Sequence, residues 1–172
     1  MPGAVETKGF YSVEELAASP GYPCRERMGK GPVAVIECTQ EIPCNPCEAA
    51  CPQGAIKVGR PITRCPELDA GKCTGCGLCI PACPGLAVFV VNLAHAPALA
   101  AVSFPWEYLP LPAKGDRVVA SDRAGKPVCE ADVLRVSCPS RNDRTAVVTV
   151  VVPVAFAERV RGMVRTGGGE RG

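Results

Sequence analysis

The sequence lacks the patterns that mark several common classes of protein. Its charges nearly balance, with 19 basic and 17 acidic residues and a formal net charge of +2, so charge gives no reason to expect nucleic acid or an anionic membrane as a partner. Its longest apolar runs, residues 86–91 and 146–152, are far too short to span a bilayer. The first residues contain no basic stretch followed by an apolar one, which is the pattern of an export signal, and we therefore expect a cytoplasmic protein.

Patterns typical of catalysis or nucleotide binding are missing as well. The single histidine, His95, stands apart from any motif, and we interpret it as a solvated linker residue rather than a ligand or a proton relay. No nucleophile–base set and no pair of catalytic carboxylates can be recognised. The glycines at 29–31 and 167–169 lack the flanking strand and helix that a nucleotide-binding loop needs. We therefore expect that the chain by itself is not an enzyme.

Cysteine, in contrast, is abundant, with 12 in 172 residues. A density of this kind indicates either a disulfide framework or a metal framework, and in a reducing cytoplasm clustered cysteines indicate metal. Six of the cysteines form an internal repeat in which the second set follows the first at an offset of 32 residues: Cys44, Cys47 and Cys51, then Cys76, Cys79 and Cys83. The repeat therefore predicts two similar metal-binding halves.

The second half carries a complete ligand run, Cys73-x2-Cys76-x2-Cys79-x3-Cys83-Pro84. This is the run with which bacterial-type ferredoxins bind 4Fe–4S clusters: three closely spaced thiolates serve three iron corners, and the fourth thiolate points to the other cluster. Mononuclear zinc instead favours two separate Cys-x2-Cys pairs in one tetrahedral site. The run therefore predicts an iron–sulfur cluster rather than zinc or disulfides.

The first half lacks the leading cysteine of that run. Glu41 stands at the equivalent position, and a carboxylate is a poor ligand for the soft iron of a cubane. Cys38 lies three residues earlier, at the end of a predicted strand over residues 32–38, and we predict that a longer loop brings it to the cluster. Cys65 is the competing ligand, although we prefer to interpret it as a small, half-buried packing residue. If no fourth thiolate reaches this site, the site would hold a 3Fe cluster.

The repeat and the crossing fourth ligand together predict two 4Fe–4S clusters. The first is expected to bind Cys38, Cys44, Cys47 and Cys83, and the second Cys51, Cys73, Cys76 and Cys79. Among the other cysteines, we interpret Cys24 as a surface or interface thiol, and Cys129 and Cys138 as packing residues. Clusters ligated by four thiolates have no open coordination site, so we expect them to carry single electrons.

The rest of the chain predicts an α+β protein organised around this unit. We expect an N-terminal arm (1–31), a two-cluster domain with the bacterial ferredoxin-like fold (32–95), a small, β-rich C-terminal module (96–165) that is barrel-like, and a disordered tail (166–172). The arm and the module together exceed a hundred residues, which is more than a free electron carrier needs, and we expect these flanks to form interfaces.

Several local elements are also predicted. In the arm, Ser12 and Glu15 form a capping box that begins a short helix. In the module, β-branched runs predict strands at 117–121, 127–136 and 145–152. Residues 155–164 are expected to form a helix whose polar side carries Arg159, Arg161 and Arg165. The aromatic and proline-rich stretch that holds Trp106 and Tyr108 is interpreted either as a docking strip or as cover for the edge of the module.

Residues 32–92 resemble bacterial-type two-cluster ferredoxins, and the second cysteine run matches that family residue by residue. The stretches at 31–56 and 102–116 also resemble ferredoxin-type subunits of multisubunit flavin-dependent amino-acid dehydrogenases, namely the proline, hydroxyproline and sarcosine-oxidase-like complexes. This resemblance implies an electron-transfer subunit that works with flavin-containing dehydrogenase subunits, often with another iron–sulfur subunit. The alternatives are a free-standing soluble ferredoxin shuttle and a non-redox binding module that metal merely braces.

Overall fold

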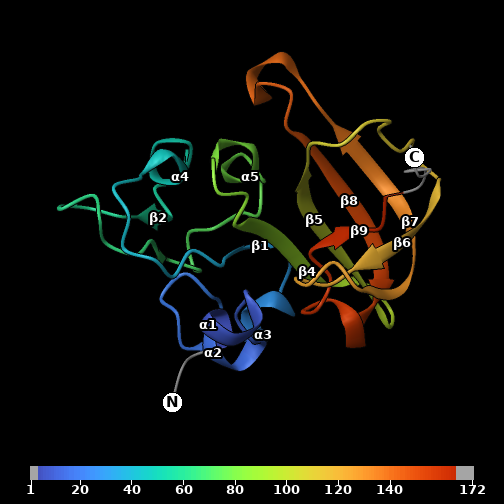
Figure 1. Ribbon diagram of the computed structural model, residues 1–172, viewed down its shortest axis with the longest axis horizontal. Helices are drawn as coiled ribbons and strands as arrows, with labels where there is room; N and C mark the ends of the chain where they lie inside the picture. The colour runs from blue at the N-terminus through green and yellow to red at the C-terminus, as the bar shows by residue number, and fades with distance from the viewer. Residues whose placement is uncertain (1–3, 166–172) are drawn as a thin grey trace.

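The structure is a computed structural model that describes residues 4–165, and the tail predicted to be disordered (166–172) lies outside the described residues. The described chain mixes helix and sheet and has only short helices, in agreement with the α+β prediction (Figure 1). Within these residues, no helix is long and apolar enough to cross a membrane.

The N-terminal arm folds into three short helices, α1 (Ala4–Lys8), α2 (Val13–Ala17) and α3 (Arg25–Met28). The predicted capping box at the start of α2 is confirmed. Ser12 Oγ accepts a hydrogen bond from the backbone N–H of Glu15, and Glu15 Oε2 accepts one from the N–H of Ser12. Leu16 and Met28 are fully buried, so the arm contributes to the core of the molecule.

The arm lies directly against the start of the cysteine-bearing segment (Figure 1). The backbone N–H of Ile36 donates to the carbonyl of Gly21, and a Cβ at Gly21 would lie only 2.8 Å from the Cβ of Ile36. Glycine is therefore needed for the arm to approach this closely.

Seven antiparallel strands form the main sheet, in the order β1-β4-β5-β8-β7-β6-β9. Their bounds are β1 Val33–Ile36, β4 Val88–Ala96, β5 Leu99–Trp106, β6 Arg117–Ser121, β7 Pro127–Ser137, β8 Ala146–Pro153 and β9 Gly162–Met163. The four strands predicted from the sequence are confirmed as β1, β6, β7 and β8. These runs are rich in β-branched residues, which pack well on a pleated surface.

The segment between β1 and β4 carries most of the cysteines and adds a small second sheet and two helices. Strand β2 (Ile56–Lys57) pairs with β3 (Glu67–Leu68), and helix α4 (Pro46–Ala49) packs beside α5 (Cys79–Ala82) (Figure 1). Two 3-10 turns, η1 (Ser140–Asn142) and η2 (Val154–Phe156), lie in the C-terminal part.

The main sheet separates two hydrophobic cores, because successive side chains of a strand point to opposite faces. On one face, Val33 and Val35 of β1 join a core enclosed by the C-terminal strands. On the other face, Ala34 and Ile36 join a second core that contains cysteines and Ile80 from the two helices. The cysteine-bearing helices therefore pack on the face of β1 and β4 that points away from the larger core.

The cysteine-bearing segment and the C-terminal strands share one continuous sheet. Strand β4 pairs with β1 on one side and with β5 on the other, where Val90 lies opposite Ser103 and Val91 opposite Val102. Strand β4 runs through Ala96, so the ladder continues across the position where the sequence predicts the module to begin.

The helix predicted over residues 155–164 is wrong. The chain forms η2 and then the short strand β9, in which Met163 pairs with Ala120 of β6. Arg161 does not lie on an exposed polar face: its side chain is 3% exposed, and its Nε donates to Glu37 Oε1 at 2.6 Å. The partner of Arg161 is 124 residues away in sequence, so this long-range ion pair overrides the local helical pattern.

The aromatic stretch at the end of β5 contributes to the core and to the surface. Trp106 is 7% exposed and makes edge-to-face contacts with Phe104 and with Tyr108. Tyr108 itself is half exposed, and its neighbour Leu109 is 79% exposed. Trp106 therefore belongs to the core of the module, while Tyr108 and Leu109 remain at the surface, and the docking strip stays a prediction.

Candidate metal centres

Four cysteines line one small cavity, which we call the first site: Cys38, Cys44, Cys47 and Cys83. Cys38 follows the end of β1, Cys44 and Cys47 come from the start of α4, and Cys83 is the last residue of the α5 turn. Ile36, Val88 and several prolines complete the walls. The structure thus brings the displaced Cys38 to the three cysteines with which the sequence groups it.

The other four predicted ligands line a second cavity, which we call the second site: Cys51, Cys73, Cys76 and Cys79. Each helix therefore serves both sites. Helix α4 carries Cys47 to the first site and is followed by Cys51 at the second, whereas α5 begins with Cys79 at the second site and ends at Cys83 in the first. This arrangement agrees with the prediction that the fourth cysteine of each run points to the site formed by the other run.

The two cavities have the chemistry that thiolate-ligated clusters need. Besides cysteine, their walls are formed largely by apolar side chains and by backbone. At the second site, the N–H of Ala34 donates to Cys73 Sγ and the N–H of Ala55 to Cys51 Sγ, each at 3.3 Å. Such bonds to sulfur stabilise thiolate and influence the reduction potential of a cluster.

Burial raises the pKa of several of these thiols. The pKa of Cys47 rises to about 11 and that of Cys79 to about 12, in both cases mainly through burial and further through neighbouring cysteines. The pKa of Cys38 is also raised, by burial first and by Cys83 next. Thiols of this kind form thiolates readily only when a bound metal compensates the charge.

The four cysteines of each site are distributed around the walls of its cavity. Within residues 4–165, no three His, Cys, Asp or Glu side chains lie close enough together to hold one metal ion. In a cubane each thiolate binds a separate iron corner, so four thiolates can surround the cluster without converging on one point.

The remaining candidate residues lie outside the two cavities. Glu41 is exposed and lines neither cavity. Cys65 is half-buried and close enough to Cys38 to contribute to raising the pKa of that thiol, after burial and Cys83, yet it does not line the first site. Cys24 is exposed, and Cys129 packs against the main core. Cys138 is exposed rather than packed, contrary to its interpretation as a packing residue.

An ion-pair cluster beside the first site could not be recognised from the sequence. The carboxylate of Glu37, the residue before Cys38, accepts hydrogen bonds from Arg123 and Arg161, and each of the three side chains is at most 11% exposed. Burial alone would raise the pKa of Glu37, but the two guanidinium groups hold it below its ordinary value. The arginines come from positions 86 and 124 residues away, and no local pattern connects them to Glu37.

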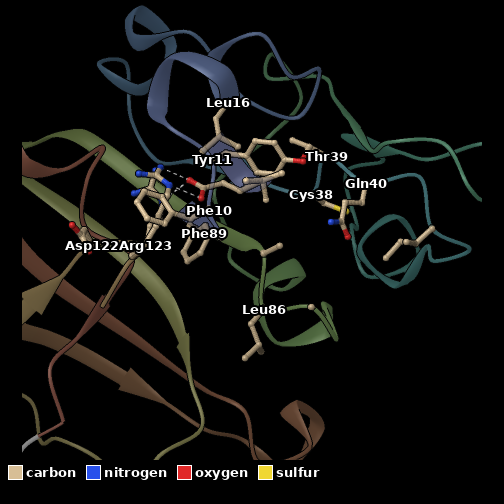
Figure 2. A pocket seen from close by; sticks show the side chains of 17 residues that line it. Phe10, Tyr11, Leu16, Cys38, Thr39, Gln40, Leu86, Phe89, Asp122 and Arg123 are labelled. Atoms are coloured by element: carbon tan, nitrogen blue, oxygen red, sulfur yellow. Dashed lines mark hydrogen bonds and ion pairs between the residues drawn. The ribbon is translucent and has the colours of Figure 1, made fainter. Parts of the chain in front are cut away.

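The same residues border a chamber of about 520 Å³ that adjoins the first site. Figure 2 shows Arg123 and Phe89 on one side of this chamber, Tyr11 of the arm near its centre and Cys38 on the other side. Three segments that are distant in sequence therefore meet beside Cys38.

A comparison with known protein families matches part of the cysteine-bearing segment. Residues 66–89, which contain the complete second cysteine run, match the model of the 4Fe–4S binding domain. A stretch of 66 residues, 38% of this chain, is 42% identical to a subunit of the ion-translocating oxidoreductase complex of Methanosarcina acetivorans. These matches support a 4Fe–4S ferredoxin-type protein with an iron–sulfur electron-transfer role. The matched stretch covers only 24% of that relative. No solved structure matches the chain.

Proposed function

We propose that this chain binds two 4Fe–4S clusters and passes single electrons between partner subunits of an oxidoreductase complex, one of which carries a flavin. The observation that carries the proposal is the pair of cavities, each lined by four cysteines and each drawing cysteines from both halves of the repeat. The first cluster would be held by Cys38, Cys44, Cys47 and Cys83, and the second by Cys51, Cys73, Cys76 and Cys79.

When bound, each cluster would accept and release one electron without a proton and without an open ligand position. The chain's own residues would then influence the reduction potential of each cluster. The apolar walls limit the access of water, and the N–H groups of Ala34 and Ala55 stabilise charge on sulfur at the second site. The shared helices α4 and α5 keep the two sites adjacent, which favours transfer from one to the other.

The partner proposal rests on the resemblance to ferredoxin-type subunits of flavin-dependent amino-acid dehydrogenases, and on a relative that is named as a subunit of an oxidoreductase complex. The arm and the C-terminal strands add a large surface to the cluster-binding core and are proposed to contact these partners. The abundance of unpaired cysteine supports a reducing, cytoplasmic location.

Native protein purified without oxygen tests both parts of the proposal. We expect about eight irons and about eight sulfides per chain, in agreement with two cubanes, and elution as part of a larger complex. About seven irons would indicate a 3Fe cluster at the first site. A colourless protein without sulfide would overturn the cluster proposal, and elution alone near 17.9 kDa would overturn the subunit proposal.

The fourth ligand of the first site can be tested separately with two serine variants. Cys38→Ser should lose iron from the first site, because an alcohol is a poor ligand for cubane iron, whereas Cys65→Ser should retain the full iron content. Iron analysis and electron paramagnetic resonance (EPR) spectra of the reduced proteins provide the measurement. The opposite result, in which only Cys65→Ser loses iron, would transfer the ligand role to Cys65.

A further inference from the structure

A groove of about 350 Å³ lies on the outer face of the main sheet, next to the second site. It crosses strands β4, β5, β8 and β7, which are neighbours in the sheet. The groove and the second site share part of their walls, because Gly75 and Val90 line both. A molecule seated in this groove would therefore be separated from the second site by little more than one layer of residues.

The strand register places three small side chains of the groove floor, Val90, Ser103 and Thr149, in line with Arg135 at the rim. Val90 lies opposite Ser103, Ser103 opposite Thr149, and Thr149 opposite Arg135. Ser103 Oγ and Thr149 Oγ1 are 2.8 Å apart and share a hydrogen bond, which keeps this row flat and compact. Three strand spacings separate the two ends of the row, so the groove extends roughly 14 Å away from the second site.

The rim of the groove is basic. His95 from β4, Lys114 from the loop before β6, and Arg135 from β7 line it and are all exposed. Among the described residues none of these three side chains forms an ion pair, and no acidic side chain lines the groove. Asp132 also lies on β7, but it pairs in register with Val151 and does not line the groove.

This basic character is local. The formal net charge of the chain is only +2, and two clusters with their thiolates would add negative charge. The molecule as a whole would therefore not attract an anionic partner strongly, whereas an unpaired basic rim can steer one to a particular place.

We propose that this basic groove is the docking surface through which the second cluster exchanges electrons with an acidic protein. The inference rests on the proposed function and extends it by naming the face and the charge of one partner. A protein fits better than a small anion, because the two cationic groups, Lys114 and Arg135, are exposed and spread along an open groove instead of converging on a buried point. In each transfer, one electron leaves the reduced cluster and reduces one acceptor centre on the partner.

The test uses the complete chain with both clusters in place, reduced chemically and mixed rapidly with one of two protein acceptors. Oxidised rubredoxin serves as an acidic acceptor, whose ferric ion takes up one electron, and oxidised cytochrome c serves as a basic one. At low ionic strength, the double variant Lys114→Glu/Arg135→Glu should transfer electrons to rubredoxin about tenfold or more slowly than the unaltered chain. Transfer to cytochrome c should not slow.

A matched control carries the same change of charge elsewhere. Lys8→Glu/Lys126→Glu alters two exposed lysines that do not line the groove, and it should change the rubredoxin rate by less than about twofold. The difference between the two double variants should shrink as added salt screens the charges.

The outcomes separate this inference from the proposed function. If the clusters are absent or cannot be reduced, the proposed function fails. If both variants keep reducible clusters but the groove variant reduces rubredoxin as fast as the unaltered chain, the groove is not the docking surface. An equal loss of rate in the control variant would likewise overturn the inference, since it would trace the effect to overall charge.

Discussion

The two cysteine sites share one repeated pattern, yet the chain builds them in different ways. At the second site, two residues separate Cys73 from Cys76, and the tight loop passes through Gly75 and Gly77 at φ +65° and +78°. At the first site, five residues separate Cys38 from Cys44, and none of these five has a positive φ. A short loop depends on the conformational freedom of glycine, whereas a longer loop reaches its ligand with ordinary backbone.

The two leading cysteines are also anchored by different parts of the molecule. The backbone around Cys73 is fixed by Arg27 of the arm, which donates to the carbonyls of Ala70 at 2.7 Å and Cys73 at 2.6 Å. The chain before Cys38 is fixed through Glu37 by two arginines of the C-terminal part. The comparison shows that the second site is supported by its own glycine-containing loop and by the arm, while the first site is supported by arginines of the C-terminal part.

The largest effect is expected from a substitution in the tight loop. A Cβ at Gly75 would lie 2.5 Å from Pro32 Cβ and 2.6 Å from the Pro32 carbonyl carbon, and the positive φ adds about 1–2 kcal/mol of strain. Gly75→Ala should therefore displace Cys73 and Cys76 and empty the second site, which removes about half of the iron. Iron analysis and EPR spectra of the reduced variant measure this loss.

Gly54→Ala is the matched control for that experiment. Gly54 has a similar φ of +57°, but nothing lies within 4 Å of the position that its Cβ would occupy. This variant should show the cost of the positive φ without a steric clash, and it should keep its iron. A Gly75→Ala protein that retained its full iron content would show that the tight loop does not distinguish the two sites.

The features that the sequence predicts correctly depend on neighbours along the chain. The cysteine run, the capping box of Ser12 and Glu15 and the β-branched strands each lie within a few residues, and the structure has them in place. The grouping of Cys38 with Cys44 required one more step, since it followed from the repeat and from the poor affinity of Glu41 for iron.

The features that the sequence does not predict depend on residues far apart. The helical pattern at 155–164 fails because Arg161 is needed as a partner for Glu37, and Val160 and Met163 are needed in the core. The continuation of β4 into the C-terminal sheet likewise depends on pairing with β5 and not on its own composition. The sequence thus predicts which cysteines line the two cavities, but not the ion pairs beside the first site.

A smaller effect is expected at the anchor of the first site. Glu37→Gln removes the negative charge but keeps the size of the side chain, and it leaves Arg123 and Arg161 buried with no carboxylate between them. Breaking a buried ion pair from one side should lower the free energy of unfolding by about 3–5 kcal/mol. An anaerobic urea titration, followed by circular dichroism and by iron–sulfur absorbance, measures the change.

Glu26→Gln provides the comparison for the buried ion pair. Glu26 pairs with Lys30, and both side chains are mostly exposed, so this change should lower the free energy of unfolding far less than Glu37→Gln does. If the two variants lose equal stability, the Glu37 cluster has no special role in supporting the first site.

The smallest effect is expected at the anchor of the second site. Arg27→Ala removes guanidinium hydrogen bonds to the carbonyls of Ala70 and Cys73, and because Arg27 is only half-buried, water can replace part of these bonds. The second cluster should then be lost faster than the first when the protein is exposed to a chelator, as followed by EPR.

Arg25→Ala, on the same helix α3, removes only an exposed ion pair and should leave the rate unchanged. Preferential loss of the first cluster in Arg27→Ala would show that the arm supports the first site and not the second. The contrast between the anchors of the two sites would then be wrong.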